Sequence, residues 1–175
     1  MFGGYKLYMY YGKIYDISIV DGPGVRVSLY VSGCRNHCKG CHNPEAQDFK
    51  FGKLFTETEK RRIFKDLDHE YIKGFTLCGG EPFEEENQRE LLPLVKEIKE
   101  TFPDKDIWCW TGYEYEDLLK NGKKHCEVTD QLLYYINTLV TGPFILSQRD
   151  ISDNNRRRGS RNQKIINLNG GNKCE

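Results

Sequence analysis

Three cysteines close together in the chain are the residues best suited to chemistry. Cys34, Cys38 and Cys41 are separated by three and by two residues. Thiolates suit zinc, copper(I) and iron–sulfur clusters. A structural zinc site takes four ligands, and a closed cluster in an electron carrier takes four cysteines. Three cysteines therefore favour a cluster in which one iron has no protein ligand and is open to another molecule.

Two other interpretations of the cysteines stay open from the residues alone. In a zinc knuckle, His42 or His37 would be the fourth ligand, although His42 adjoins Cys41, which strains a shared tetrahedral site. In a simple electron carrier, Cys78 would be the fourth ligand after folding. The glycines of the loop, Gly33 and Gly40, would let backbone amides approach a cluster closely.

A glycine pair follows a predicted strand, in the sequence Gly79-Gly80-Glu81-Pro82. Taken alone, this segment is more typical of an ordinary turn from a strand into a helix than of a binding site. After a three-cysteine loop, it favours a binding turn whose backbone can approach a ligand, since glycines present no side chain.

At this point the sequence resembles a known family. The CxxxCxxC loop and the Gly-Gly-Glu-Pro turn resemble the radical S-adenosylmethionine (SAM) enzymes, and two segments are similar to their glycyl-radical activating members. Three further stretches resemble the branch that activates anaerobic ribonucleoside-triphosphate reductases, and the match covers about Ile14 to Leu168. The segments that carry these resemblances are 21–26, 33–45, 110–113, 142–144 and 158–163.

Two positions matter for the choice of branch. The superfamily often has an aromatic residue before the third cysteine, whereas this chain has Gly40, which is common in the reductase-activating branch. The resemblance therefore favours that branch over pyruvate formate-lyase activase. Thr141 stands where the branch usually has aspartate, which leaves the role of that carboxylate unfilled.

The resemblance implies a cofactor set and a reaction. A 4Fe–4S cluster would be held by Cys34, Cys38 and Cys41, and the amine and carboxylate of SAM would chelate the fourth iron. Reductive cleavage of SAM would give methionine and a 5′-deoxyadenosyl radical, which would take hydrogen from a glycine of the large subunit of the reductase. A flavodoxin-type protein is the expected electron donor.

Six further positions are candidate SAM-binding residues on this resemblance. Backbone carbonyls of Gly79 and Gly80 would meet the SAM ammonium, Glu81 would add charge and Pro82 would stiffen the turn. His42 and Asn43, beside the cluster, would contact SAM, tune the cluster or simply close the loop. Trp110, Tyr113 and Tyr115 are weaker candidates for the adenine site, since tryptophan in a strand is more often core.

Two alternatives to this function remain. One is activation of a different glycyl-radical enzyme, such as pyruvate formate-lyase, or radical chemistry on a small molecule. The other is a zinc-binding interaction module without catalysis. Metal analysis separates the second from the first, because a zinc module is colourless and contains no labile sulfide.

Composition narrows the class of protein. The 175 residues carry 26 acidic and 26 basic side chains, so no overall charge predicts binding to nucleic acid or to a membrane surface. The start of the chain has no signal-peptide pattern, and seven cysteines without a secretory context favour metal chemistry over disulfides.

We expect a cytoplasmic protein with one domain over 1–175, whose core spans about 14–168 and whose ends, 1–13 and 169–175, are peripheral. The basic run 156–158 is expected to be a solvated loop or a docking patch.

The elements that must position these motifs alternate between strands and helices. Strands are predicted over 25–31, 75–78, 107–110, 138–140 and 164–168, and helices from about Thr56, over 85–101, around 115–120 and near 130–135. Pro93 is expected near a helix start, where it costs little. This order predicts an α/β fold, an open, partial (βα) barrel of mostly parallel strands as in a truncated radical SAM fold. The loops 33–43, 79–82 and 111–113 should meet at one sheet edge.

Arg26 lies at the start of the predicted strand that leads into the cysteine loop. A surface salt bridge is its default role, and contact with a SAM carboxylate or with a partner is the alternative.

Overall fold

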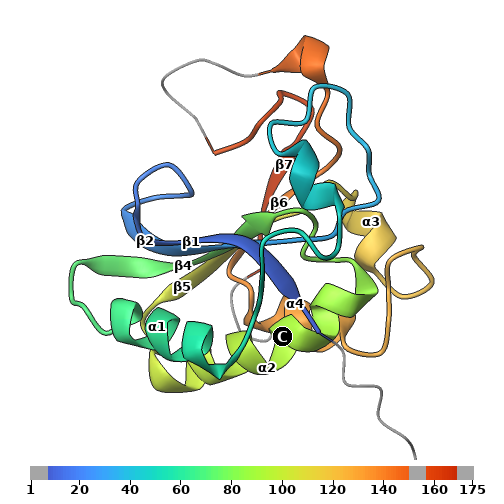
Figure 1. The fold of residues 1–175 in the computed structure, drawn as a ribbon. Coiled ribbons are helices and arrows are strands. Elements are labelled where there is room, and N and C mark those ends of the chain that lie inside the picture. Colours follow the sequence, from blue (N-terminus) through green and yellow to red (C-terminus); the bar gives the residue numbers. More distant parts are fainter. Residues whose placement is uncertain (1–7, 150–156, 169–175) are drawn as a thin grey trace, which may run out of the picture.

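Seven strands form one sheet in the order β3-β1-β2-β4-β5-β6-β7, in a computed structural model that describes residues 8–149 and 157–168 (Figure 1). The strands are β1 (Tyr10–Ser18), β2 (Val25–Val31), β3 (Lys53–Leu54), β4 (Ile72–Gly79), β5 (Asp106–Trp110), β6 (Thr138–Thr141) and β7 (Lys164–Asn167). All five predicted strands are present, and β1 and β3 are additions to them.

The sheet is mixed. The four central strands β2, β4, β5 and β6 pair in parallel, while β1 pairs antiparallel with β2 and β3, and β7 pairs antiparallel with β6. The predicted α/β class and the open sheet are confirmed. The prediction of mostly parallel strands holds for the centre only, since both margins run antiparallel.

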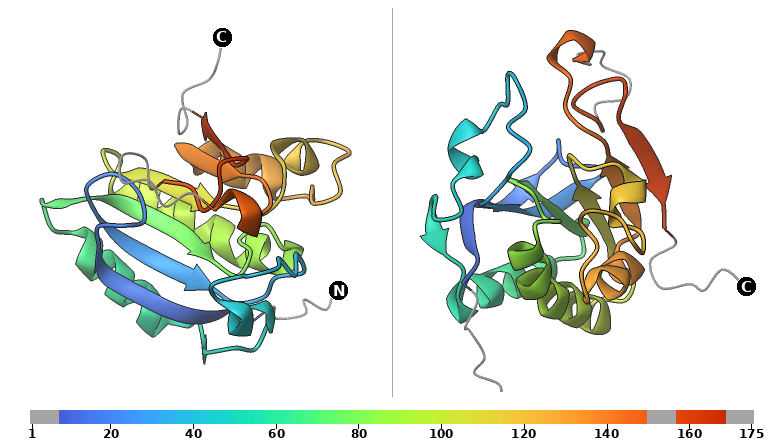
Figure 2. Two further views of the ribbon diagram at one scale, coloured as in Figure 1. Left: turned by 90° about the horizontal axis from the view of Figure 1, so that it is seen from above. Right: turned by 90° about the vertical axis from the view of Figure 1, so that its right-hand side faces the viewer.

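Helices cover one face of this sheet. They are α1 (Glu57–Leu67), α2 (Glu85–Thr101), α3 (Tyr115–Leu118) and α4 (Thr129–Tyr135), with short 3-10 turns at Pro44–Gln47 and Leu146–Gln148. Figures 1 and 2 show α1, α2 and α4 together beneath the strands. Thr56 caps α1 and forms a capping box with Glu59. No helix among the described residues has the length and apolarity that a membrane crossing requires.

The two faces of the central strands differ because successive side chains point to opposite sides. Odd-numbered residues of β2, β4 and β5 form the apolar core with the helices: Val27, Leu29, Val31, Phe75, Leu77, Ile107 and Cys109. Even-numbered residues on the other face are polar or aromatic: Arg26, Ser28, Tyr30, Thr76, Cys78, Trp108 and Trp110. The face without helices is therefore the one that can carry chemistry.

Two local features differ from expectation. Met9 and Tyr11 are buried in the core, so the core begins before Ile14. Pro93 lies in the middle of α2 and is exposed, so it is not at the helix start. Without an amide hydrogen it leaves the carbonyl of Arg89 without its helical hydrogen bond.

Candidate functional site

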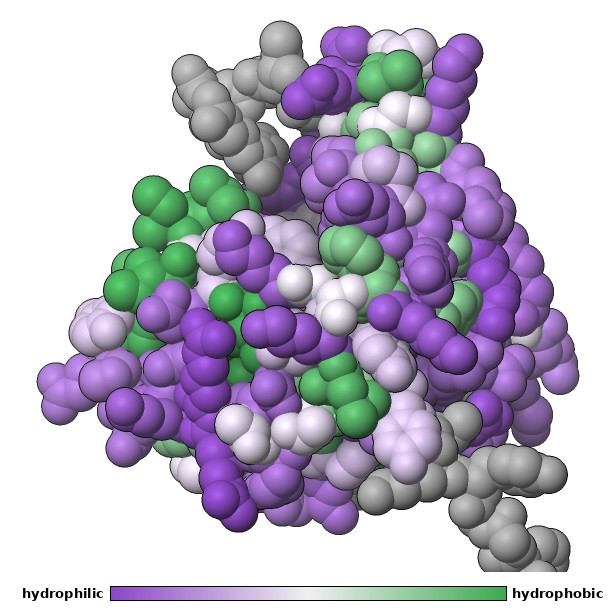
Figure 3. All heavy atoms as spheres, viewed as in Figure 1, coloured by the Kyte–Doolittle hydropathy of each residue, from purple (hydrophilic) through white to green (hydrophobic). Residues whose placement is uncertain are grey.

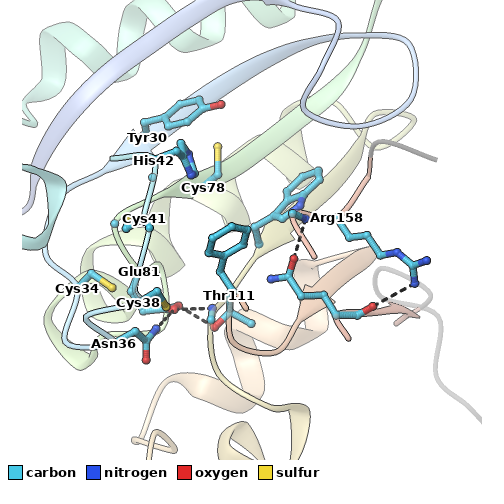
Figure 4. A pocket seen from close by; sticks show the side chains of 18 of the residues that line it. Tyr30, Cys34, Asn36, Cys38, Cys41, His42, Cys78, Glu81, Thr111 and Arg158 are labelled. Atoms are coloured by element: carbon cyan, nitrogen blue, oxygen red, sulfur yellow. Dashed lines mark hydrogen bonds between the residues drawn. The ribbon is translucent and has the colours of Figure 1, made fainter. Parts of the chain in front are cut away.

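A pocket of about 540 Å³ lies where the three motif-bearing loops meet, as the sheet topology predicts (Figure 4). The loops follow β2, β4 and β5, so they leave the carboxyl ends of parallel neighbours. Its lining includes Cys34, Cys38, Cys41, His42, Gly79, Gly80, Glu81, Thr111 and Gly112. The three cysteines and the glycine turn therefore face one space, although they are far apart in sequence.

Backbone contacts hold the cysteine loop at both of its ends. The amide of Gly33 donates to the carbonyl of Ala46 at 2.8 Å, and the amide of Cys34 donates to the carbonyl of Gln47 at 3.2 Å. Gly33 has φ +95°, and a Cβ there would lie 2.3 Å from the ring of Phe49. A side chain is therefore excluded at the start of this loop.

The glycine turn packs directly on the start of the cysteine loop. The amide of Gly80 donates to the carbonyl of Val31 at 2.7 Å, and the amide of Glu81 donates to the carbonyl of Gly33 at 2.8 Å. A Cβ on Gly80 would lie 2.6 Å from that same Gly33 carbonyl oxygen. The glycine pair therefore allows the turn and the start of the cysteine loop to pack backbone against backbone, and it also lines the pocket.

Glu81 joins all three loops through its carboxylate, which is fully buried. One oxygen accepts from the amide of Phe83 at 2.9 Å and from the hydroxyl of Thr111 at 2.7 Å. The other accepts from Asn36 at 3.0 Å and from the amide of Gly112 at 2.7 Å. Burial nevertheless raises the pKa of Glu81 to about 7, because these hydrogen bonds offset only part of the desolvation. The role expected for Glu81 was added charge toward SAM, and in this structure its acceptors are taken by the chain itself.

Glu84 anchors the cysteine loop to the start of α2. This buried carboxylate accepts from the backbone and the guanidinium of Arg35, at 2.9 and 2.6 Å, from the hydroxyl of Tyr113 at 2.8 Å and from Lys124 at 2.8 Å. Burial alone would raise the pKa of Glu84, but these donors outweigh it and lower the pKa. Arg35 also contacts Glu86 at 2.7 Å, so the residue after the first cysteine is tied at two points.

The donor set fits an iron–sulfur cluster better than a single metal ion. Among the described residues, no three His, Cys, Asp or Glu side chains converge as ligands of one ion. Thiolates of a cluster bind separate irons, so they need only line one space, as Cys34, Cys38 and Cys41 do. Burial, with help from Glu81 and Glu84, raises the pKa of Cys34 to about 11. A thiolate there would need positive charge beside it, which irons would supply.

The remaining candidate residues do not all lie in the main pocket. His42 lines the main pocket and, with Asn43, a smaller one of about 350 Å³. Pro82 is buried behind the turn. Trp110 lines the main pocket, whereas Tyr113 points its hydroxyl to Glu84.

The structure contradicts both roles considered for Arg26, a surface salt bridge and contact with SAM or a partner. The side chain is fully buried, pairs with Asp106 at 2.8 Å and donates to Thr76 at 2.7 Å and to the carbonyl of Phe75 at 2.9 Å. Arg26 therefore has a structural role: its buried side chain connects β2 to β4 and β5 on the polar face of the sheet.

Tyr30 was not predicted to belong to the site, while Cys78 was considered only as a fourth cluster ligand and Arg158 only as part of the basic run and of a segment of resemblance. Tyr30 and Cys78 pair across neighbouring strands and line the side of the pocket opposite Asn36 and Glu81 (Figure 4). Arg158, part of the basic run, also lines the pocket, while Arg156 lies outside the described residues.

Thr141 takes a structural role where the related branch usually has aspartate. It is buried, and its hydroxyl donates to the carbonyl of Tyr113 at 2.5 Å, next to the hydrogen bond of 2.8 Å from the amide of Gly142 to the same oxygen. A carboxylate could not donate in this way, so threonine fits the strand end that this chain has.

Comparisons with known proteins agree with this geometry. Residues 20–166 match the family described as a 4Fe-4S single cluster domain. The chain is 37% identical over 157 residues to the anaerobic ribonucleoside-triphosphate reductase-activating protein of Enterobacteria phage T4, covering 90% of this chain and 93% of that protein. Proteins of the same name from Haemophilus influenzae and Escherichia coli K12 are 41% and 38% identical, over 82% and 91% of this chain and 90% and 99% of their own lengths. The iron–sulfur description favours the cluster over the zinc interpretation.

Proposed function

Because the chain belongs to the family of the anaerobic ribonucleoside-triphosphate reductase-activating proteins, we propose that it generates a glycyl radical on such a reductase. It does so by reductive cleavage of SAM. The observation that carries the proposal is the convergence of three thiols and a glycine turn on one pocket. Three thiols suit a cluster with an open iron, and a glycine turn suits a ligand that approaches the backbone.

Cys34, Cys38 and Cys41 would hold a 4Fe–4S cluster, and SAM would complete it. The chemistry that the bound cluster supplies is one electron for breaking a C–S bond of SAM, which yields methionine and a 5′-deoxyadenosyl radical. The protein's task is to bind and orient these groups.

The chain's own residues would divide this task. Gly79 and Gly80 line the pocket and, without side chains, let the turn pack directly on the backbone of Val31 and Gly33 at the start of the cysteine loop. Glu81 and Glu84 hold the three loops in register and so fix the distance between the cysteines and the turn. Positioning of this kind is worth several powers of ten in rate when reacting groups must meet in one geometry.

The finer assignments follow the same resemblance. We propose that the open mixed sheet is a truncated radical SAM barrel, that the chain acts as a single domain in the cytoplasm, and that a flavodoxin-type protein supplies the electron. An open sheet supports a polypeptide substrate, because a glycine on a loop of another protein needs a way in.

The test starts with anaerobic protein reconstituted with iron and sulfide. After reduction, we expect an EPR signal that changes on addition of SAM, 5′-deoxyadenosine in the reaction mixture, and a glycyl radical once the reductase is added. Cys38→Ser should lose both the changed signal and the product, whereas Cys126→Ser, whose half-buried thiol is not part of the pocket lining, should keep them. A colourless protein with one tightly bound zinc and no 5′-deoxyadenosine would refute the proposal.

A further inference from the structure

The end of β1 and the turn that follows it form a tip, residues 17–20, which exposes a cluster of aliphatic side chains. Ile17, Ile19 and Val20 are 56%, 74% and 66% exposed. Figure 3 shows hydrophobic residues gathered over this turn, on a surface that is otherwise mainly polar. Single exposed aliphatic residues are ordinary, but a contiguous group on one tip is typical of a binding surface.

The backbone of this tip is fixed, although its side chains are in water. The carboxylate of Asp21 accepts from Ser18 at 2.6 Å and from Tyr30 at 2.7 Å, and its carbonyl accepts from Thr76 at 2.8 Å. Gly22, with φ +122°, provides the turn that these bonds require. A surface that is already ordered loses little entropy on binding.

The tip also forms part of the pocket mouth. Val20 and Asp21 line the same pocket as the cysteines. Gly40 of the cysteine loop lines this pocket too, and Leu146, which is 45% exposed, lies against Gly40. A molecule that enters the pocket beside Val20 therefore passes the exposed aliphatic side chains of the tip.

We propose that Ile17, Ile19 and Val20 are a docking surface for the polypeptide of the partner reductase, which they hold beside the pocket while its glycine enters. This inference rests on the proposed function. A glycine within a chain cannot enter alone, since the residues on either side of it must lie over the mouth. Apolar flanking residues of that segment would bury the aliphatic tip, and burial of such side chains on a fixed surface is a main source of affinity.

A second copy of this chain is the other occupant to consider, and the geometry disfavours it. Val20 belongs to the pocket wall itself. A permanent dimer on this tip would cover the mouth that the proposed substrate needs. A transient complex with the reductase covers it only while the radical is being transferred.

The test compares three variants of the full, reconstituted protein. Ile19 lies outside the pocket lining, so Ile19→Asp should leave the formation of 5′-deoxyadenosine without reductase within about twofold of wild type, while the Kd for the reductase rises at least about tenfold. Ile19→Leu should bind as wild type does. The matched control is Tyr134→Asp: Tyr134 is 49% exposed and belongs to α4, on the face of the sheet opposite the pocket, so its Kd should not change.

The outcomes separate this inference from the proposed function. If wild type activates the reductase and Ile19→Asp binds it equally well, the docking surface is refuted while the function stands. Equal loss in Tyr134→Asp, or a wild-type dimer that Ile19→Asp dissolves without a change in Kd, also refutes it. If wild type neither binds the reductase nor forms 5′-deoxyadenosine, both proposals fail.

Discussion

Glu81 shows how much a single buried carboxylate can organise. Four donors from three loops meet its two oxygens, and none of them is a charged group. Hydrogen bonds from neutral donors stabilise the ionised form less than a cation would, so burial dominates and raises the pKa to about 7. The protonation of this residue therefore changes near neutral pH.

A pH dependence of stability follows from that pKa. The unfolded glutamate has an ordinary pKa near 4.3, so between about pH 4.5 and 7 the folded state binds more protons than the unfolded state. Stability from this residue is complete below that window and is lost as the pH rises through about 7. Relative to Glu81→Gln, the wild type should lose on the order of 3 kcal/mol between pH 5 and 8, measured by urea unfolding of the iron-free protein.

The opposite trend would contradict this account. If the wild type gains stability over Glu81→Gln as the pH rises, the four hydrogen bonds outweigh burial and the pKa of Glu81 is lowered. In the Glu81→Gln variant the new side-chain amide would itself face donors, so an offset that does not vary with pH is expected besides the trend.

For single residues, the sequence predicted some positions in the site but not the partners of residues that are far apart in the chain. The spacing of Cys34, Cys38 and Cys41 predicts their shared loop, because these residues are local neighbours. Arg26 has partners about 50 and 80 positions away, which no local pattern reveals. The same is true of the bond between Glu84 and Arg35, which depends on where α2 begins in space.

Among the elements, the parallel centre was predictable and the antiparallel margins were not. The strand β2 is buried almost throughout, so its apolar run predicts a central strand. The strand β1 has no regular alternation, because irregularities between Tyr11 and Lys13 and between Tyr15 and Ser18 break its period. The strand β3 has only two residues, which is too short for any pattern.

The helix α2 carries a testable irregularity. Pro93 is exposed in its middle, so Pro93→Ala should restore the hydrogen bond to the carbonyl of Arg89 without disturbing the core. We expect the free energy of unfolding to rise by about 1–3 kcal/mol, less any entropy that proline removes from the unfolded chain. Urea unfolding should show a higher midpoint with an unchanged slope.

Pro93→Gly is the matched control for that measurement. It restores the same amide but has poor helix propensity, so it should gain about 1 kcal/mol less than alanine. A loss of stability in Pro93→Ala would mean that the proline has a role in the helix that the hydrogen-bond pattern does not reveal.

For the whole molecule, the core and the site lie on opposite faces of one sheet. The helices bury the odd-numbered side chains of β2, β4 and β5, and the pocket uses the even-numbered ones near the ends of the strands. The loops are held by protein contacts: the amide of Glu81 to the carbonyl of Gly33, and Glu84 to Arg35. The fold therefore has its own sources of stability apart from any cofactor.

Removal of iron should test that independence. We expect the iron-free protein to keep its far-UV circular dichroism and a single cooperative thermal transition, at a lower Tm because a bound cluster stabilises the folded state by mass action. Hydrogen exchange should become faster at 33–43 and stay slow in β2, β4 and β5. A chain that unfolds on loss of iron, as small zinc domains do, would contradict this expectation.

The division of the sheet into two faces also sets how freely this sequence can change over time. In β2, a residue such as Leu29 in the core and its neighbour Tyr30 at the pocket share one backbone, so repacking beneath the sheet moves the pocket wall above it. The outer sides of α1 and α2 have no such connection. Mutations should therefore accumulate readily on these helices, while inherited change in the central strands requires compensating substitutions on both faces at once.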